Sequence, residues 1–322
     1  MSFVSKSVSA ILTLTALSFS STAEANDKLL CVYDPGGKSG DAFKTSERYK
    51  AAAAGWGVNF TLKPYTDEAI AATDFQNGAC DAVLLTGVRT QQFNRKSYSV
   101  EALGLTTNYN QLKAAIGVLA KPNAASLMVS GQFETVGIYP AGAVYLYARD
   151  RTNTDISVLA GKKVATMDFD KAAPVMVQHI GATAVASDIG NFAQKFNNGA
   201  VFACYAPATA YGPLELNKGL GTDGGVIKFP LAQLTLQMLI RTESFPADFG
   251  QQSRTWAAGQ FDSVLRLTNA AESSIGSAGY WVDLDAAKTA QYRTMLSEVR
   301  ATLVAQGAYD PTIVKLVERI AQ

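Results

Sequence analysis

The chain has 322 residues, of which 48% are hydrophobic, and it carries 28 basic and 27 acidic side chains. Because this balance is nearly neutral and no run of Lys and Arg is interleaved with aromatic residues, we expect no nucleic-acid partner. Beyond the first 25 residues no window holds 18 consecutive apolar residues, so we expect no membrane insertion of the mature chain.

The first 25 residues have the layout of a secretory signal peptide. Lys6 supplies a positive charge, Val8 to Phe19 is a largely apolar stretch, and Ala23-Glu24-Ala25 is a small-x-small cleavage sequence. The stretch is shorter than the roughly 20 apolar residues that a membrane-spanning helix needs. We predict cleavage after Ala25 and a periplasmic protein. Since Asn26 rather than Cys follows, we expect no lipid anchor.

The residues after the signal alternate between strand-like and helix-like segments. The predicted strands cover residues 29–33, 58–62 and 81–87, and a helix covers 40–54. A second helix begins at Thr66-Asp67-Glu68 and ends at Asn77-Gly78, a favoured helix stop. Apolar strands bounded by turn residues and separated by helices indicate a parallel sheet that is covered on both faces.

The same order of elements recurs later in the chain. The predicted strands here are 163–167, 182–186 and 201–205, with one helix carrying Met176 and His179 and another running from Ile189 to Asn198-Gly199. Two units of this kind, near 29–86 and 163–205, imply two α/β lobes. The length agrees, because domains hold roughly 100–200 residues each.

The remainder of the chain is predicted to be mostly helical. Helical segments are expected from Pro246 to about Thr268, from Asp285 to Gln306, and from Asp310-Pro311 onward. The apolar residues of the last two segments recur at helical spacing, which is typical of core contacts.

The cysteine and histidine content limits the chemistry. The chain has three cysteines, Cys31, Cys80 and Cys204, and a single histidine, His179, so we expect no zinc site and no cofactor. Cys31 and Cys80 lie at two strands of the same lobe and could form a disulfide, which would leave Cys204 single. Three buried free thiols are the equally weighted alternative.

The motifs of nucleotide hydrolysis and nucleophilic catalysis are incomplete. Gly36-Gly37-Lys38-Ser39-Gly40 resembles the end of a P-loop, but Val32 stands where the first glycine is required. A glycine turn before a helix can still present N–H groups to an anion. A catalytic triad would have to recruit His179, which lies on an apolar helix, and no G-x-S-x-G motif occurs. We therefore do not expect an enzyme.

Polar and aromatic residues gather instead at or near the predicted strand ends. In open α/β sheets, ligands bind beyond the carboxyl ends of the strands. Both predicted lobes contribute such residues, and tyrosines among them can stack on a ligand and use their hydroxyl groups. We predict an interlobe cleft lined by Asp34, Lys38, Arg89, Tyr139, Asp168, Tyr205 and Tyr211.

Several segments resemble the solute-binding proteins of TRAP transporters. Leu159-Ala160-Gly161-Lys162-Lys163-Val164-Ala165 is similar to the strand that opens the second lobe of that family, and the residues from Ser187 to Pro207 resemble its next helix and strand. Ile180-Gly181-Ala182-Thr183 and, in the first lobe, Asn77-Gly78-Ala79-Cys80-Asp81-Ala82 fit as well.

The resemblance implies an α/β, two-lobed periplasmic-binding-protein-like fold of type II, in which each lobe is a mostly parallel sheet flanked by helices and the C-terminal third is helical. The first lobe would comprise residues 26–145 and about 230–262. The second would comprise 146–229 and about 263–322, after a signal peptide over 1–25.

The chain departs from the family at three positions that concern the ligand. The arginine that pairs with a ligand carboxylate in the family falls at Ala165, and two acidic positions become Phe202 and Tyr205. The resemblance therefore implies the fold but not a carboxylate ligand. A bound anion would need Arg89 or Lys38.

The favoured function is capture of a small organic ligand in the interlobe cleft by hinge closure, followed by delivery to inner-membrane transporter subunits. Two alternatives stay open. One is an envelope accessory or scaffold protein, working beside an efflux system, that keeps the fold without ligand delivery. The other is an exported enzyme with an unrecognised pair of carboxylates.

Overall fold

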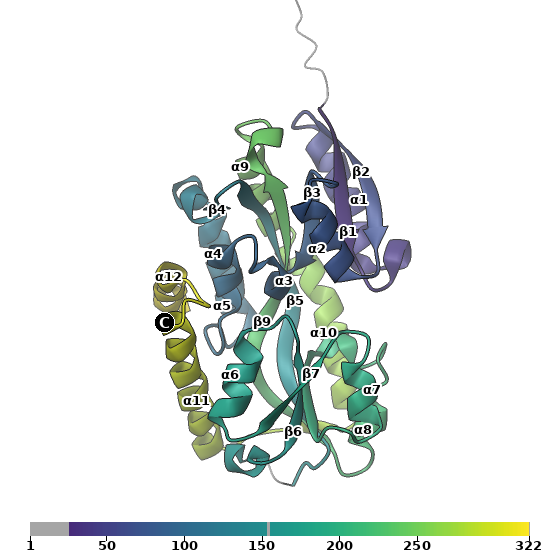
Figure 1. Cartoon of the computed structure of the whole chain (residues 1–322), viewed down its shortest axis with the longest axis vertical. Coiled ribbons are helices and arrows are strands. Elements are labelled where there is room, and N and C mark those ends of the chain that lie inside the picture. Colours follow the sequence, from purple (N-terminus) through teal and green to yellow (C-terminus); the bar gives the residue numbers. More distant parts are fainter. Residues whose placement is uncertain (1–25, 153–154, 322) are drawn as a thin grey trace, which may run out of the picture.

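The computed structural model describes residues 26–152 and 155–321, so the predicted signal peptide lies outside the described residues. Figure 1 shows two lobes stacked along the long axis, with helices packed against the sheet in each. A mixed sheet runs through both lobes in the order β2 (Val58–Tyr65), β1 (Asn26–Tyr33), β3 (Ala82–Thr86), β9 (Gly225–Arg241), β5 (Phe133–Ala148), β8 (Ala203–Pro207), β6 (Lys163–Met167) and β7 (Thr183–Ser187).

The first lobe contains the predicted strand–helix–strand unit. Strands β2, β1 and β3 are parallel neighbours, and the connecting helices are α1 (Asp41–Ala54) and α2 (Glu68–Gln76). Asp67 caps α2 as expected, because its carboxylate accepts hydrogen bonds from the backbone N–H groups of Ala69 and Ile70. The sequence prediction of these elements is confirmed to within a few residues.

The second lobe repeats this arrangement with β8, β6 and β7, which are parallel to one another. The connecting helices are α6 (Ala172–His179) and α7 (Phe192–Asn197), and α8 (Asn217–Leu220) follows β8. Helix α7 begins three residues later than predicted, because Asp188 and Asn191 form a turn before it.

Two long antiparallel strands, β5 and β9, pass through both lobes. In the first lobe β9 pairs with β3, and in the second lobe β5 pairs with β8. Their pairing shifts register at three places, near Gly137, near Gly142 and between Val144 and Leu146. At Gly142 the backbone has φ +109°, and an added Cβ would stand 3.1 Å from Thr268, so only glycine fits this crossing. From the sequence we expect a mostly helical chain beyond Tyr205. This expectation is wrong for residues 225–241, which form the strand β9.

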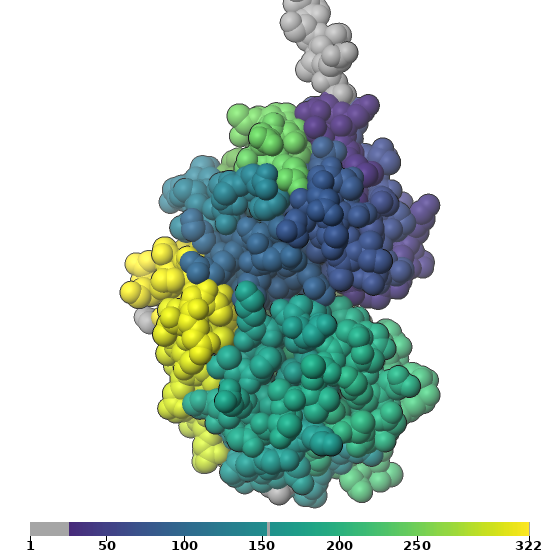
Figure 2. Space-filling model, in the orientation of Figure 1, coloured from purple at the N-terminus to yellow at the C-terminus, as the bar shows by residue number. Residues whose placement is uncertain are grey.

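The C-terminal helices connect the lobes on one side. Helix α11 (Ala286–Ala305) packs against α6 of the second lobe, and α12 (Pro311–Ala321) packs against α5 (Tyr109–Leu119) and α4 (Arg95–Tyr98) of the first. Figure 2 shows them as a yellow ridge that spans the waist between the two masses. The other described elements are α3 (Gly87–Thr90), α9 (Phe249–Gly259), α10 (Phe261–Ser277), β4 (Val129–Ser130) and β10 (Trp281–Val282).

The segment that begins at Pro246 differs from the single helix expected to end near Thr268. It forms two helices instead, α9 and α10, which meet at Gln260, and α10 continues to Ser277. The break allows α9 to pack on the first-lobe half of β5 while α10 runs on toward the second lobe.

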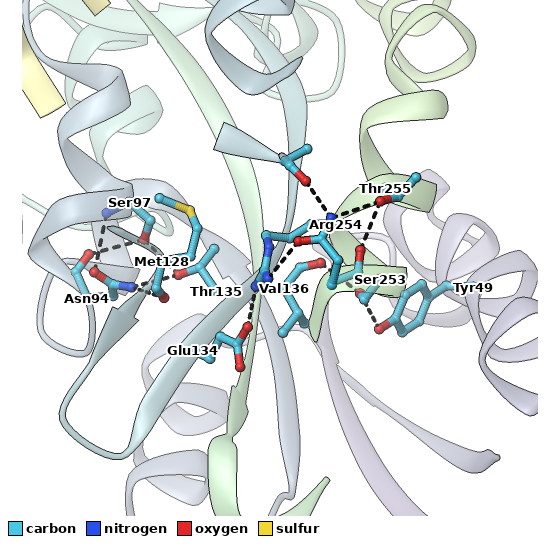
Figure 3. A network of polar contacts seen from close by, with 12 residues as sticks. Tyr49, Asn94, Ser97, Met128, Glu134, Thr135, Val136, Ser253, Arg254 and Thr255 are labelled. Atoms are coloured by element: carbon cyan, nitrogen blue, oxygen red, sulfur yellow. Dashed lines mark hydrogen bonds and ion pairs between the residues drawn. The ribbon is translucent and has the colours of Figure 1, made fainter. Parts of the chain in front are cut away.

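A buried polar network anchors α9 to β5 in the first lobe (Figure 3). Tyr49 and Ser253 share a hydrogen bond of 2.7 Å, and the Ser253 hydroxyl donates to the Val136 carbonyl, also at 2.7 Å. Arg254 forms a buried ion pair with Glu134. A second group, formed by Asn94, Ser97 and Thr135, lies on the other side of β5. These contacts fix the first-lobe end of the connecting strand.

Cys31 and Cys80 are joined by a disulfide, with their Cα atoms 6.0 Å apart, and Cys204 is free and buried. The bond ties β1 to the segment just before β3 across a sequence separation of 49 residues. A crosslink that closes a loop of this length restricts the unfolded chain, which typically stabilises the folded state by about 2–4 kcal/mol.

Replacing both Cys31 and Cys80 with Ala is therefore expected to lower the free energy of unfolding by about 2–4 kcal/mol. The measurement is urea denaturation of wild type and variant, with Cys204→Ala as the control that keeps the bond. Thiol titration of the denatured, unreduced wild type should find one free thiol. Three free thiols, or a double variant as stable as wild type in oxidising buffer, would contradict the assignment.

Candidate functional site

The carboxyl ends of the parallel strands from the two lobes face each other across the waist of the molecule. From the first lobe come Tyr33 at the end of β1 and α3 after β3, and from the second come the loops after β6 and β7. Ile189 of the β7–α7 loop packs against the first-lobe cluster that contains Tyr33. The lobes therefore touch at the place where open α/β sheets bind ligands.

Arg89 contacts the second lobe from the carboxyl end of β3. Its guanidinium carbon lies 3.8 Å from the centre of the Phe169 ring, which follows β6 in the second lobe. Within its own lobe the Arg89 Nε lies 3.5 Å from Oε2 of Glu68, the first residue of α2. The Glu68 carboxylate is almost fully buried and also accepts the backbone N–H of Thr86 at 2.6 Å. Burial raises the pKa of Glu68, and the Arg89 charge opposes that rise.

Glu101, which is absent from the residues predicted to line the cleft, lies beside this group. Its Oε1 accepts the backbone N–H and the hydroxyl of Thr235 on β9, at 2.6 and 2.5 Å. The carboxylate packs so closely on Gly87 that a Cβ there would stand 1.9 Å from Oε1. Its other oxygen, Oε2, is buried without a hydrogen-bond partner in the described part of the chain. Burial raises the pKa of Glu101 to about 8, and the charges of Asp170 and Glu68 act in the same direction.

Asp170 approaches from the second lobe, one residue after Phe169. Its Oδ1 accepts the backbone N–H groups of Ala172 and Ala173 at the start of α6, and its Oδ2 accepts the Tyr205 hydroxyl at 3.0 Å. Burial raises the pKa of Asp170. Asp170 lies in the predicted loop but is not among the predicted site residues, which include Asp168 from this loop.

Of the predicted residues, Arg89 and Tyr205 lie at the waist. The Tyr205 hydroxyl accepts the backbone N–H of Met167 and donates to Asp170, so it orients that carboxylate. Asp168 also lies in the β6–α6 loop, but its side chain is exposed. Whether these residues contact a ligand stays a prediction.

Asp34 and Lys38 occupy the glycine turn, where the structure differs from the expected anion site. The Asp34 carboxylate accepts the backbone N–H groups of Gly36, Ala42 and Phe43 at 2.8–3.1 Å. A Cβ at Gly40 would stand 1.8 Å from this carboxylate, so the glycine is needed to admit it. The turn's N–H donors are therefore used by Asp34, and Lys38 is exposed on the surface of the turn.

The side chains of Tyr139 and Tyr211 pack inside their own lobes. Tyr139 is buried in the core of the first lobe, where its hydroxyl has no partner among the described residues. Tyr211 packs against Tyr280 in the second lobe, with the ring centres 6.1 Å apart. The structure does not bring these two tyrosines together with Arg89.

Two other features of the described residues bear on function. A hollow on the second lobe is lined by residues that include Asp155, His179 and Met295, and His179 lies 3.2 Å from Glu298. Within residues 26–152 and 155–321, no group of three or more His, Cys, Asp or Glu residues is placed to hold a metal ion. None of the helices in these ranges is long and apolar enough to cross a membrane.

The raised pKa of Glu101 predicts how stability changes with pH. In the folded protein Glu101 keeps its proton up to about pH 8, whereas in the unfolded chain it loses the proton near the ordinary pKa of 4.5. The stabilisation that comes from this tighter proton binding is therefore complete below pH 4.5 and is lost as the pH rises to 8. For each pH unit by which the folded and unfolded pKa values differ, the free energy of unfolding changes by about 1.4 kcal/mol.

The Glu101→Gln side chain cannot ionise. Between pH 5 and pH 8.5 the free energy of unfolding of the variant should therefore rise by a few kcal/mol relative to that of wild type. Urea denaturation at several pH values measures the free energy of unfolding of both proteins. Subtracting one value from the other at each pH removes the contributions of the other titratable groups, which the two proteins share. Parallel stability profiles for the two proteins would show that the Glu101 carboxyl titrates normally.

The sequence of this chain matches a known protein family. Residues 50–322 match the family model described as "Solute-binding protein AdeT 1/2". The chain is 39% identical over 289 residues to the probable solute-binding protein AdeT1 of Acinetobacter baumannii, covering 90% of this chain and 95% of that one. It is 27% identical over 225 residues to the probable solute-binding protein AdeT2 of the same organism, covering 69% and 93%.

Solved structures share the fold at much lower identity. A TRAP periplasmic solute-binding protein from Ralstonia eutropha H16, with bound (S)-2-acetolactate, has a TM-score of 0.73 at 13% identity, covering 92% of this chain and 98% of that one. One from Xanthobacter autotrophicus with bound β-D-galacturonate has a TM-score of 0.70 at 15% identity, covering 91% and 99%. The predicted type II, two-lobed α/β fold is confirmed. The chain belongs to the AdeT 1/2 family of solute-binding proteins, a class that binds ligands and is not enzymatic.

Proposed function

We propose that this protein is exported to the periplasm, captures a small organic ligand between its two lobes and delivers it to inner-membrane transporter subunits. The amino-terminal segment with its Ala23-Glu24-Ala25 sequence supports export. The family membership supports solute binding, and the fold relatives that carry acetolactate and galacturonate show that this architecture accommodates such ligands.

The observation that carries the proposal is the contact between Arg89 and Phe169. It joins the two lobes at the carboxyl ends of β3 and β6, where each side also presents buried polar groups. The connection through β5 and β9 leaves few chain crossings between the lobes, which suits a hinge. We take the lobes as residues 26–145 with about 230–262, and 146–229 with about 263–322, with α12 reaching back to the first lobe.

The decisive experiment is recovery of a ligand. Protein purified from the periplasm is denatured, the released small molecules are identified by mass spectrometry, and they are added back to refolded, ligand-free protein. At a concentration 100 times Kd, a ligand should stabilise the protein by about 2.7 kcal/mol. Recovery of the molecule unchanged after incubation separates binding from catalysis. A protein that releases nothing would instead support the accessory or scaffold function.

Phe169→Ala should weaken binding of the recovered ligand by about twofold to thirtyfold, because it removes a cation–aromatic contact of about 0.5–2 kcal/mol that exists only when the lobes are together. Phe202→Ala is the matched control, since Phe202 makes the same type of contact with Lys162 inside the second lobe, at 5.1 Å. The affinities are measured by calorimetry. Equal losses in both variants, or none in Phe169→Ala, would contradict a site closed by this contact.

Arg89→Ala is a less clean test than Phe169→Ala. It would leave the buried Glu68 carboxylate without its ion-pair partner, so stability should fall along with binding.

A further inference from the structure

The ionisable side chains at the waist are predominantly acidic. Three carboxyl groups, Glu68, Glu101 and Asp170, interact electrostatically there, and among the described residues the cation Arg89 contacts one of them, Glu68. Arg89 is already paired with Glu68 at 3.5 Å. The remaining two carboxyl groups, one from each lobe, have no cationic partner in the described ranges.

Glu101 has an unused hydrogen-bonding position in this group. Its side chain is 3% exposed, its Oε1 is held by Thr235, and its Oε2 has no partner in the part of the chain that the structure describes. An unpaired carboxyl oxygen in a buried place destabilises a protein, since it has lost its water and gained nothing in return. Native proteins keep such a group where it has a functional role or where a bound water or ion completes its hydrogen bonding.

Gln233 is an independent second observation. It is 1% exposed, and neither its amide nitrogen nor its carbonyl oxygen has a partner in the described structure. Gln233 lies two residues before Thr235 on β9, so by strand alternation its side chain is on the same face as the Thr235 hydroxyl that holds Glu101. One face of β9 therefore carries Gln233 and, through Thr235, holds Glu101. Both side chains are buried and have polar atoms without a hydrogen-bond partner among the described residues.

An anionic ligand does not fit these groups. Once Glu101 is ionised, an anion would lie near two carboxylates, Glu101 and Asp170, in a desolvated place where like charges repel strongly. The cation that could offset this, Arg89, is held by Glu68, and Ala165 occupies the strand position where the resemblance places an arginine. A cation suits these groups better, because an ionised carboxyl group accepts charge-assisted hydrogen bonds from the N–H groups of an ammonium or a guanidinium.

Resting on the proposed function, we infer that the ligand is a small organic cation, a protonated amine or a guanidinium, whose N–H groups donate to Glu101 and Asp170 while Gln233 binds a neutral polar part. Closure of the lobes brings the two carboxyl groups to opposite sides of the charged nitrogen. The specificity of this chain then differs in sign from that of fold relatives with bound acids.

Binding of a cation is coupled to loss of a proton. Glu101 faces Glu68 and Arg89 from the first lobe, Asp170 from the second, and shares this environment with Tyr98 and Tyr309. With its pKa at about 8, Glu101 must release its proton to solvent before it can pair with the ligand. Affinity should therefore fall by roughly tenfold for each pH unit below that value.

The test compares matched probes of opposite charge on ligand-free wild-type protein. Butylammonium, 1,4-diaminobutane and methylguanidinium are set against butyrate, succinate and galacturonate, with the melting temperature as the readout and calorimetry for any hit. The charge of the ligand released from the periplasmic preparation is determined in parallel. We expect an ammonium or guanidinium probe to stabilise the protein and the released ligand to be a cation.

Variants connect the result to the named residues. Glu101→Gln and Asp170→Asn should each weaken cation binding at least tenfold, and Glu101→Gln should remove the pH dependence. Glu298→Gln, an exposed carboxylate on α11, is the matched control and should bind as wild type.

Two outcomes separate this inference from the proposed function. Stabilisation by the carboxylates, or an anionic or uncharged released ligand, would overturn the inference while leaving solute binding intact. If no ligand is released and no probe binds, the proposed function fails and the inference fails with it.

Discussion

The structure depends on the constraint that two strands, β5 and β9, belong to both lobes at once. Each strand must satisfy the hydrogen bonding of one lobe, cross the waist and continue in the other, so the lobes can neither separate nor fold independently. The crossing is made at Gly142, whose φ of +109° other residues rarely adopt. The network of Tyr49, Ser253, Glu134 and Arg254 ties the first-lobe end of β5 to α9, and we infer that the angle between the lobes changes at the crossing.

Burial of carboxyl groups at this waist follows from the same constraint. Because the strand ends of both lobes point at each other, polar side chains that would otherwise be solvated are enclosed when the lobes meet. The cost of burying Glu68 is offset by its ion pair with Arg89 and by the hydrogen bond from the Thr86 N–H. The cost of burying Asp170 is offset by the hydrogen bonds from Tyr205 and from the start of α6. Glu101 accepts hydrogen bonds on one of its two carboxyl oxygens only, among the described residues. The unpartnered oxygen of Glu101 is the position at which the inferred ligand would bind.

The sequence predicts the βαβ units well, since Asp67, Asn77-Gly78 and the apolar strands are local signals that the fold does not override. The long strands escape prediction, because Gly137, Pro140 and Gly142 interrupt the pattern of β5 and the strands are buried on both faces. Arg89 and Tyr205 are identified by their position at strand ends. Glu101 comes from a short 3-10 helix that no strand precedes, and its one local signal is an acid within the apolar run from Val100 to Leu105. Its partner Thr235 is 134 residues away, a relation that local patterns do not contain.

We infer that the lobes move about the β5–β9 crossing and close over a site at the waist. The direct measurement is the distance between spin labels placed on the two lobes, at Lys50→Cys on α1 and Lys218→Cys on α8, in a Cys204→Ala background that keeps the native disulfide. Both lysines are exposed, so labels there should leave the packing intact. With the recovered ligand at saturation, the account predicts that the distance distribution narrows and shifts to the shorter distance of the closed structure. An identical distribution with and without bound ligand would contradict it.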